Sequence, residues 1–425
     1  MNGTLVAAPP TAWRNPNFLG GVWHGALLAA STALSDVTVV LPAFIHDLTG
    51  SSVWVGGLIA LLAVSGALPQ IFVARFVEPM RRKRPVLLGA IYLRASSLAV
   101  LGLFIAFGES TAPRVMMIAL AVMLGLFAAG GALGNVPYTD LIGRVIPASY
   151  RGKFFASRQM IGSLLALASS ALAGALLTIS WPRNYAALFL VAALVLAVSS
   201  LGIWAISEPP VEESTERQPW SEYLRSLREP VRRLGSTVLV FWITGVSLLA
   251  VPFYIVAARR SYGAPPEAMA LFIAAIALGA MAGNYAWGRL VDNFGSRRML
   301  VVYVWFATAT PVLGLLAGIL GWLVLLPAAM LVGATMGGRR VGFQSALLEE
   351  APASRRSSYA AVYALMGLPV AIMPLVGGWI AERWSFSTLF TVTSLAMLAA
   401  AVVVRSWASP ATGLPRLPSS HGIDA

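Results

Sequence analysis

Charged side chains within otherwise apolar stretches are the residues of this sequence whose types could do chemistry. Asp36 is the clearest case, because it stands among apolar residues shortly before Pro42. An ionised group is costly to hold in hydrocarbon, so such residues usually serve a function. Asp36 could bind a proton or a cationic group. Alternatively, its carboxylate accepts hydrogen bonds from neighbouring hydroxyl groups such as that of Thr32, or is hydrated near the outer end of its helix.

Four basic residues occupy similar apolar surroundings: His24, Arg94, Arg339 and Arg340. His24 could relay protons, although a histidine satisfied by helix packing is the commoner case. For Arg94 we expect a structural ion pair with an acid on a neighbouring helix. The two adjacent arginines could attract an anionic substrate, or could extend along their aliphatic stems to the inner membrane interface.

A further group of six polar residues lies near one end of several apolar runs. They are Gln70, Asn135, Asp140, Arg158, Asn284 and Gln344.

The sequence carries no enzyme signature. It has no G-x-S-x-G, H-E-x-x-H or P-loop pattern, no cysteine, and three histidines without metal-ligand spacing. We therefore expect no catalytic residue, no metal site and no cofactor.

The composition is that of a membrane protein. Of the 425 residues, 58% are hydrophobic and 11% are charged, whereas a soluble domain has about a quarter charged residues. The net charge of +13 could suggest nucleic-acid binding. Membrane proteins, however, collect arginine and lysine in cytoplasmic loops, so we expect membrane lipids as partners and no nucleic acid.

Twelve apolar runs are long enough to cross a bilayer, which requires roughly 20 residues per helix. Backbone groups in lipid must bond within their own segment, so these runs are expected to be helices in an all-α fold. They begin near Phe18, Val53, Pro85, Val115, Phe154, Ala186, Thr237, Ala268, Met299, Trp322, Tyr359 and Thr388.

A short polar pattern occurs twice. Residues 288–298 read GRLVDNFGSRR, and residues 74–84 repeat its small residue, its acid and its basic pair. A second echo links residues 147–154 with 352–359. Repetition at about half the chain length predicts two related halves. The pattern residues are Gly288, Asp292, Gly295, Arg297 and Arg298 in the second copy, and Glu78, Lys83 and Arg84 in the first.

This G-x-x-x-D-x-x-G-x-R-R pattern resembles the signature loop of the major facilitator superfamily. The second copy departs from it only at Asn293, where a basic residue is usual, whereas the first copy is degenerate. The resemblance implies two pseudo-symmetric six-helix bundles, which we place at residues 18–206 and 237–406. It also implies that the first, fourth, seventh and tenth helices line a central cavity. In such a protein we expect most of the six polar residues named above, the candidate gate residues, to close a cytoplasmic gate rather than to touch a substrate.

The resemblance further implies a gating role for the loop acids. When the cytoplasmic side is shut, Asp292 would contact the start of the fifth helix near Gly152, and Glu78 the start of the eleventh near Ser357. An acid at a helix N-terminus is stabilised by unpaired N–H groups and by the helix dipole. The alternative is that the loop is only a tight turn that fixes topology.

The distribution of basic residues predicts that both termini are cytoplasmic, because arginine is concentrated in alternate loops. Arg259 and Arg260 are the one pair that argues the other way. We expect residues 1–17 to form a cytoplasmic segment and 407–425 a disordered tail. Residues 207–236 read as a linker with an interfacial amphipathic helix, or alternatively as a regulatory or partner-binding loop.

These features predict a secondary active transporter of a small solute that works by alternating access. Without a nucleotide site, uphill transport would be driven by protons, another coupling ion or substrate exchange. We expect a monomeric, multi-pass protein of the plasma or bacterial inner membrane. The alternatives are a non-transporting membrane sensor on the same scaffold and, less favoured, an integral-membrane enzyme that modifies lipid.

Overall fold

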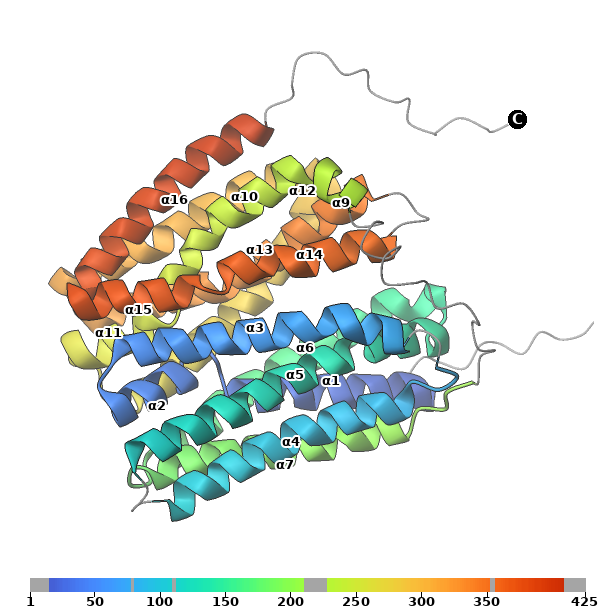
Figure 1. Cartoon of the computed structure of the whole chain (residues 1–425), viewed down its shortest axis with the longest axis horizontal. Coiled ribbons are helices and arrows are strands. Elements are labelled where there is room, and N and C mark those ends of the chain that lie inside the picture. The colour runs from blue at the N-terminus through green and yellow to red at the C-terminus, as the bar shows by residue number, and fades with distance from the viewer. Residues whose placement is uncertain (1–14, 78–79, 109–111, 210–227, 352–355, 409–425) are drawn as a thin grey trace, which may run out of the picture.

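The computed structural model describes residues 15–77, 80–108, 112–209, 228–351 and 356–408. Most of the predicted N-terminal segment, most of the predicted linker helix, the predicted tail and Glu78 lie outside these residues. Within them the chain is helical (Figure 1).

The N-terminal half contains six membrane crossings, and the first of them is split into two helices. The elements are α1 (Pro16–Leu34), α2 (Val40–Thr49), α3 (Ser52–Val77), α4 (Arg84–Phe107), α5 (Pro113–Val145), α6 (Ala148–Leu177) and α7 (Arg183–Trp204).

The C-terminal half follows a short helix, α9 (Arg228–Arg233), and repeats this plan. Its elements are α10 (Gly235–Gly245), η2 (Val246–Leu249), α11 (Phe253–Ser261), α12 (Ala268–Leu320), η3 (Trp322–Val324), α13 (Leu325–Glu350), α14 (Arg356–Val370), α15 (Met373–Arg383) and α16 (Phe386–Ala408).

Two irregularities reconcile these helices with the twelve predicted crossings. The 53-residue α12 holds two spans, and it bends at Gly295, whose φ of 78° is the left-handed conformation that glycine adopts at little cost. The first crossing is broken at residues 35–39, between α1 and α2. The predicted all-α architecture of twelve crossings is therefore confirmed.

The predicted starts of the helices agree closely with the observed ones, with one larger difference. The fifth crossing, α6, begins at Ala148 rather than near Phe154. Its first turns carry Arg151 and Lys153, so hydropathy alone places the start too late, where the apolar residues begin.

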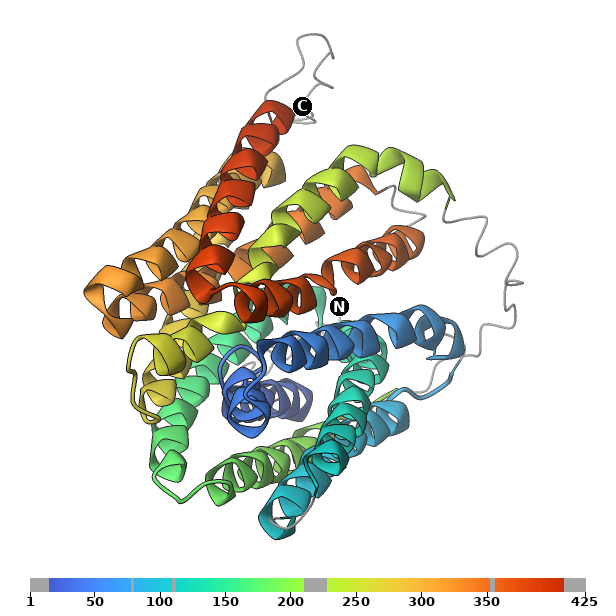
Figure 2. The same ribbon diagram turned by 60° about the vertical axis from the view of Figure 1, so that its left-hand side comes forward.

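The helices form two bundles. In the first, α4 packs on α5 and α7, and α1 packs on α6 and α7. In the second, α12 packs on α13 and α16. The bundles meet where α3 lies along α14 and α15, where α6 meets α12, and where α2 meets α11 (Figures 1 and 2).

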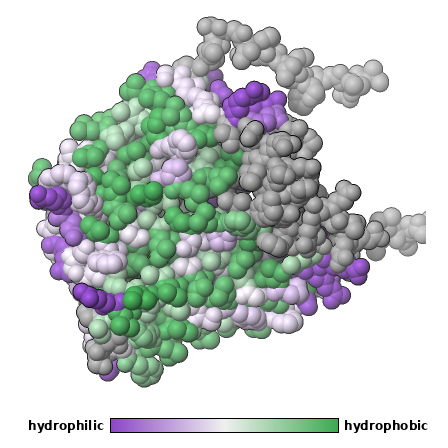
Figure 3. All heavy atoms as spheres, viewed as in Figure 1, coloured by the Kyte–Doolittle hydropathy of each residue, from purple (hydrophilic) through white to green (hydrophobic). Residues whose placement is uncertain are grey.

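The outer surface matches a lipid environment. Large apolar side chains face outward along the helices, and Ile319 is 83% exposed. Figure 3 shows hydrophobic residues over the middle of one face and hydrophilic residues toward its two ends. This distribution is expected of helices that cross a bilayer.

Candidate functional site

The two bundles are joined by polar contacts at one end of the molecule. We call this the closed end, and it carries Asp47, Ser51, Tyr185, Arg259 and Glu382. The opposite end, which carries the Gly288–Arg298 loop, is the loop end. Every hydrogen bond and ion pair that joins the bundles between two described residues lies at the closed end.

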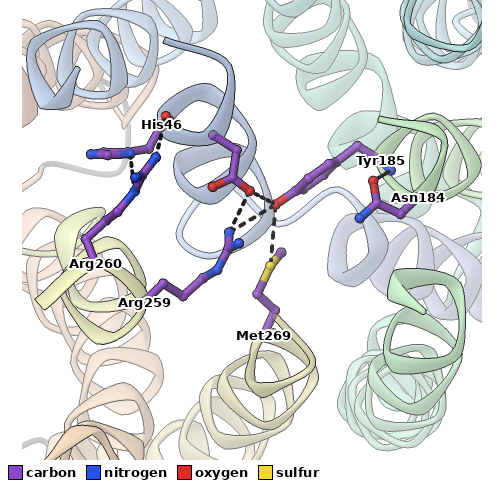
Figure 4. Close-up of polar contacts among 7 residues, drawn as sticks. His46, Asn184, Tyr185, Arg259, Arg260 and Met269 are labelled. Carbon is purple, nitrogen blue, oxygen red and sulfur yellow. Dashed lines mark hydrogen bonds and ion pairs between the residues drawn. The ribbon is translucent and has the colours of Figure 1, made fainter. Parts of the chain in front are cut away.

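The centre of the closed end is a triad of Asp47, Tyr185 and Arg259, and Figure 4 labels the last two of these side chains. Arg259 Nη1 in α11 lies 2.7 Å from Asp47 Oδ2 in α2, and the Tyr185 hydroxyl donates to the same oxygen at 2.9 Å. The side chains of Arg259 and Asp47 are only 19% and 17% exposed. A charge-assisted pair shielded from water to this degree is stronger than an open surface pair.

A second contact lies beside the triad. Arg260 Nε donates to His46 Nδ1 at 3.1 Å, and Arg260 Nη2 reaches the His46 carbonyl at 3.5 Å. Because the arginine can only donate, the His46 ring accepts through Nδ1 and its proton is on Nε2. Both arginines of α11 therefore bind consecutive residues of α2 in the other bundle.

Glu382, near the end of α15, caps a helix of the other bundle. Its Oε2 accepts from Ser51 Oγ at 2.6 Å and from the Val53 backbone N–H at 2.9 Å, at the start of α3. An acid at a helix N-terminus is stabilised there by unpaired N–H groups. This is the kind of interbundle contact that the sequence predicts for Asp292, but it occurs at the opposite end of the molecule.

Two glycines bring the backbones of α3 and α15 into contact. A Cβ atom at Gly56 would overlap with the Pro374 carbonyl, and one at Gly378 would overlap with the Ser52 carbonyl. The two helices run antiparallel, so these contacts lie one turn apart along the same seam. The closed end is therefore packed backbone to backbone as well as held by charges.

Sequence reasoning missed most of this end. It noted Arg259 and Arg260 only as an exception to the charge distribution, and it did not single out Asp47, Tyr185 or Glu382. The exception was itself a usable signal, because paired arginines in a loop that should carry few positive charges call for a local reason.

At the loop end, the Gly288–Arg298 loop binds only its own bundle among the described residues. The backbone N–H and the hydroxyl of Ser296 donate to Glu349 at 3.1 and 2.6 Å. Arg297 lies 3.7 Å from Glu350 and over the Trp407 ring at 4.9 Å.

The predicted gating acid is not engaged in this structure. Asp292 and Arg298 are exposed, and no hydrogen bond or ion pair joins either to another described residue. Apart from its chain neighbours and the adjacent backbone of α6, no heavy atom lies within 4 Å of a Cβ position at Gly152, the expected contact of Asp292. The structure is therefore a state in which this end of the two bundles is not latched through Asp292.

The first copy of the loop is also tied within its own bundle. Lys83 is buried and forms an ion pair with Asp140 of α5, which Arg144 also contacts at 2.5 Å. The backbone N–H groups of Lys83 and Arg84 donate to Glu208 at 2.7 and 2.9 Å.

The two loops are related in three dimensions as well as in sequence. In each bundle a basic loop residue pairs with an acid near the end of the fourth crossing: Lys83 with Asp140, and Arg297 with Glu350. The repeat therefore extends to the contacts that hold each loop.

The structure does not join the six candidate gate residues to one another across the bundles by hydrogen bonds or ion pairs. Gln70 donates to Gly66 of its own helix at 3.0 Å, and Asn284 lies against Gly337 of α13. Asn135 and Gln344 are exposed, whereas Asp140 pairs with Lys83. Arg158 lies inside the first bundle.

Asp36 caps a turn in the break of the first crossing. Its Oδ1 accepts from the Thr38 backbone and hydroxyl at 2.7 and 2.5 Å and from the Val39 N–H at 2.8 Å. The carboxylate is thus bonded to a hydroxyl, but to that of Thr38. The Thr32 hydroxyl donates to the Leu28 carbonyl instead. Asp36 thereby fixes the turn of residues 37–39 that leads into α2, whose own N-cap residue is Val39.

This cap predicts different effects for two substitutions of Asp36. Asp36→Ala removes the acceptor, so the free energy of unfolding should fall by about 1 kcal/mol, whereas Asp36→Asn keeps a capping oxygen and should lose much less. Thermal unfolding in detergent measures both. Loss of proton-coupled uptake in a stably folded Asp36→Asn protein would assign the charge to coupling, and equal destabilisation by both changes would contradict the cap.

Arg339 is a structural cation. Its Nη1 donates to Thr244 at 2.8 Å and its Nη2 to the Phe241 carbonyl at 2.7 Å, and its guanidinium lies 4.0 Å from the centre of the Phe241 ring. It thus ties α13 to α10. Its neighbour Arg340 points to the exposed side of α13.

His24 and Arg94 lie inside the first bundle. His24 Nδ1 is 3.1 Å from Ser199 Oγ, whose proton is donated to the Leu196 carbonyl, so the histidine donates through Nδ1. In place of an acid, Arg94 faces the Phe127 ring, with 4.4 Å between the guanidinium carbon and the ring centre.

These features define a class: a multi-pass helical membrane protein built as two repeated bundles that are joined at one end. The sequence profile of the Major Facilitator Superfamily matches residues 25–367 and, in a second match, residues 236–421. The chain therefore belongs to this family of transporters. No sequence among curated proteins matches it.

Solved structures share the fold. The nucleoside transporter NupG superposes with a TM-score of 0.72 at 12% identity, covering 92% of this chain and 99% of that one. A bacterial homologue of the iron transporter ferroportin in its inward-facing state gives 0.68 at 16% identity, with coverage of 92% and 99%. A D-xylose–proton symporter gives 0.63 at 15% identity, with coverage of 92% and 95%. Identities this low establish the fold and not the substrate.

Proposed function

We propose that this protein carries a small solute across the membrane by alternating access, and that the structure is its inward-open state. The observation that carries the proposal is the asymmetry between the two ends. Polar contacts and touching backbones join the bundles at the closed end, whereas Asp292 at the loop end has no partner among the described residues. A transporter in which one mouth is shut and the other is released would have this pattern.

The charge distribution supports the orientation. Lys83, Arg84, Arg297 and Arg298 cluster at the loop end, and basic residues accumulate on the cytoplasmic side. We therefore place the loop end and both termini in the cytoplasm. The ferroportin homologue supports the same assignment, because its inward-facing structure superposes better (0.68) than its outward-facing structures (0.63 and 0.59).

The broken helices support a central site. The first crossing is interrupted at residues 35–39 and the seventh at residues 246–252, which are corresponding positions of the two halves. In transporters built from repeats, discontinuous helices at corresponding positions mark the place of the substrate and coupling ion. Counterflow of candidate solutes in proteoliposomes, with and without a pH gradient, tests transport and its driving ion directly.

Asp292→Asn should slow transport without lowering the stability of the folded protein. Asp292 is exposed and its side chain forms no hydrogen bond or ion pair with a described residue, so we expect the free energy of unfolding to change by less than about 0.5 kcal/mol. Turnover should fall, because the inward-closed state would lose the attraction between the acid and the N-terminus of α6, which is about 0.3–2 kcal/mol. Counterflow and thermal unfolding of the same preparation measure both effects.

The matched control is Glu267→Gln, which removes one exposed acid from the same bundle at its other end. It should leave turnover unchanged. Because Glu267 is the N-cap residue of α12 without a side-chain capping bond, the free energy of unfolding should change by no more than about 0.3–1 kcal/mol. Turnover of the Asp292→Asn protein equal to that of the wild type would contradict the gating role.

A further inference from the structure

Two arginines inside the first bundle have no acidic partner. Arg94 of α4 faces the Phe127 ring at 4.4 Å, and Arg158 of α6 faces the Tyr138 ring at 5.0 Å. Among the described residues no carboxylate pairs with either guanidinium and no oxygen accepts from one. An uncompensated charge in a membrane-spanning helix is costly and is usually retained for function.

The aromatic rings offset only part of this cost, and the enclosed polar atoms of these side chains have no hydrogen-bond partner. The Nε atoms of Arg94 and Arg158 are buried without a hydrogen-bond partner, and so is the hydroxyl of Tyr138. A guanidinium has five donors and no acceptor. Only Nε of each guanidinium is enclosed without a partner, so the terminal nitrogens are the donors that a bound acceptor could use.

Two other buried cations of this chain, Arg339 and Lys83, have oxygen acceptors within the protein. Arg339 donates to two oxygens, and Lys83 pairs with Asp140. The protein thus supplies acceptors to the cations that hold its helices together. Arg94 and Arg158 lack such acceptors.

Glycines give both arginines room to reach the interior. A Cβ atom at Gly25 of α1 would overlap with the side chain of Arg158, and one at Gly130 of α5 would lie 2.7 Å from Arg94 Cγ. The His24 ring lies 5.8 Å from the Tyr138 ring that Arg158 faces, and a Cβ atom at Gly131 of α5 would lie 3.8 Å from Arg94 Cζ. Both arginines therefore lie against α5 inside the first bundle, and we call the two arginines with His24 the basic cluster.

The cluster lies on the cytoplasmic side of the break in the first crossing. An α-helix rises 1.5 Å per residue, so Gly25 is roughly 15 Å from the end of α1 near Asp36, in the direction of the loop end. In the inward-open state, a solute that enters from the cytoplasm would meet this cluster before it reaches the break.

We propose that Arg94 and Arg158, with the Tyr138 hydroxyl, bind an oxyanion group of the transported solute, which is a carboxylate or a phosphate. The planar guanidinium matches both groups with paired hydrogen bonds, and the enclosed hydroxyl adds a neutral donor. This inference rests on the proposed transport function and specifies its substrate class: anionic solutes.

Binding to the purified, detergent-solubilised protein tests the site without transport. Succinate and inorganic phosphate are titrated at constant ionic strength against sodium chloride, with xylose and choline as neutral and cationic comparators. The readouts are thermal shift, since a ligand that binds only the folded protein raises its Tm, and titration calorimetry. At least one oxyanion should raise the Tm, and the comparators should not.

Arg94→Gln and Arg158→Gln should each weaken oxyanion binding by about 10- to 100-fold, the range expected for losing charged hydrogen bonds. Arg158→Lys should be intermediate. Gly25→Ala should weaken binding by displacing Arg158 while it leaves every charge in place. The matched control is Arg289→Gln, which removes an exposed cation stacked on Tyr285 at 4.4 Å, and its affinity should equal that of the wild type.

The Tm of the ligand-free variants distinguishes an anion-binding role of Arg94 and Arg158 from a structural role. Removing an unpaired charge should leave the Tm of the ligand-free protein unchanged or raised, whereas Arg339→Gln should lower it, because Thr244 and the Phe241 carbonyl would lose their donors. A lowered Tm for Arg158→Gln together with unchanged anion affinity would overturn the proposal. So would the absence of any oxyanion-dependent shift in the wild type.

The outcomes also separate this site from the proposed function. Counterflow of a neutral solute that is unaffected by Arg94→Gln and Arg158→Gln would leave transport in place and remove the anion site. Oxyanion binding that requires both arginines, in a protein without counterflow of the bound anion, would keep the site and contradict transport.

Discussion

Replacing Gly56 with alanine is expected to force the closed end open and to reduce transport, whereas the same change at Gly57 is expected to be almost silent. The three atoms nearest to a Cβ at Gly56 are backbone atoms of Pro374 and Leu375 in the other bundle. No side-chain rotation relieves that overlap. Overpacking of this kind costs about 1–3 kcal/mol, so the closed-end population should fall by about 10- to 100-fold relative to the open one.

The chain's lack of cysteine makes this measurement direct. Nitroxide labels at Ser180→Cys and Glu267→Cys place one probe on each bundle at exposed positions of the closed end. Pulsed electron–electron double resonance spectroscopy measures the distance between the two labels. In the Gly56→Ala protein the distribution should shift to longer distances, and counterflow should decrease.

Gly57→Ala is the matched control on the next residue of the same helix. Its Cβ would lie 3.7 Å from Leu375 Cδ1, which is an ordinary contact. Alanine also favours a helix over glycine by about 1 kcal/mol, so this protein should be as stable as the wild type or more stable. A distance distribution of Gly56→Ala that matches that of Gly57→Ala would show that the backbone contact does not hold the end shut.

Arg259→Gln is expected to have the second-largest effect, because it leaves the Asp47 carboxylate with the Tyr185 hydroxyl and without its cation. Charged hydrogen bonds of partly buried groups contribute about 1.5–3 kcal/mol. The closed-end population should therefore fall by about 10- to 100-fold, with the same change in the label distances. Arg383→Gln removes an exposed arginine at the same end and should change nothing.

A charge swap sharpens this test. The single change Asp47→Arg should open the closed end, and the double change Asp47→Arg with Arg259→Asp should restore part of the closed population. The interaction free energy from the double-mutant cycle isolates the pair from the rest of the interface. An interaction free energy of zero between positions 47 and 259 would show that this ion pair does not hold the closed end shut.

The proposed alternating access requires that the closed end open and close reversibly. Its polar and backbone contacts are the Asp47 triad, the His46–Arg260 contact, the Glu382 cap and the close packing at Gly56 and Gly378. Each contributes a few kcal/mol at most, and they lie beside a buried apolar cluster that includes Phe44 of α2 and Phe253 of α11. Two states that differ by a few kcal/mol can both be populated, and a ligand that binds one of them better can shift the balance.

The two ends use the same physical device at different sites. Glu382 caps α3 from the other bundle, and the proposed contact of Asp292 with the N-terminus of α6 would do the same at the loop end. Each contact can exist only when its own end is shut. A carboxylate released from one helix N-terminus is exposed to water, as Asp292 is here, so exchange between the states need not bury either of these two acids without a partner.

The sequence by itself determined the membrane-crossing architecture of this protein. The number and order of crossings follow from the lengths of apolar runs, which are local properties fixed by bilayer thickness. The repeated loop pattern determined the division into halves and the bend of α12 at Gly295, where a positive φ requires glycine. The hydrogen bonds of Asp36 are also local, because its partners Thr38 and Val39 lie only two and three positions later in the sequence.

Only the tertiary structure decided which charges meet. Arg259 contacts Asp47, which is 212 positions away in the sequence, and Glu382 contacts Ser51, which is 331 positions away. No local pattern encodes such pairs, and they exist in one of the two states that the same sequence must support. The structure likewise decided that Arg339 is satisfied while Arg94 and Arg158 are not, because the supply of acceptors depends on how helices from distant parts of the chain pack together.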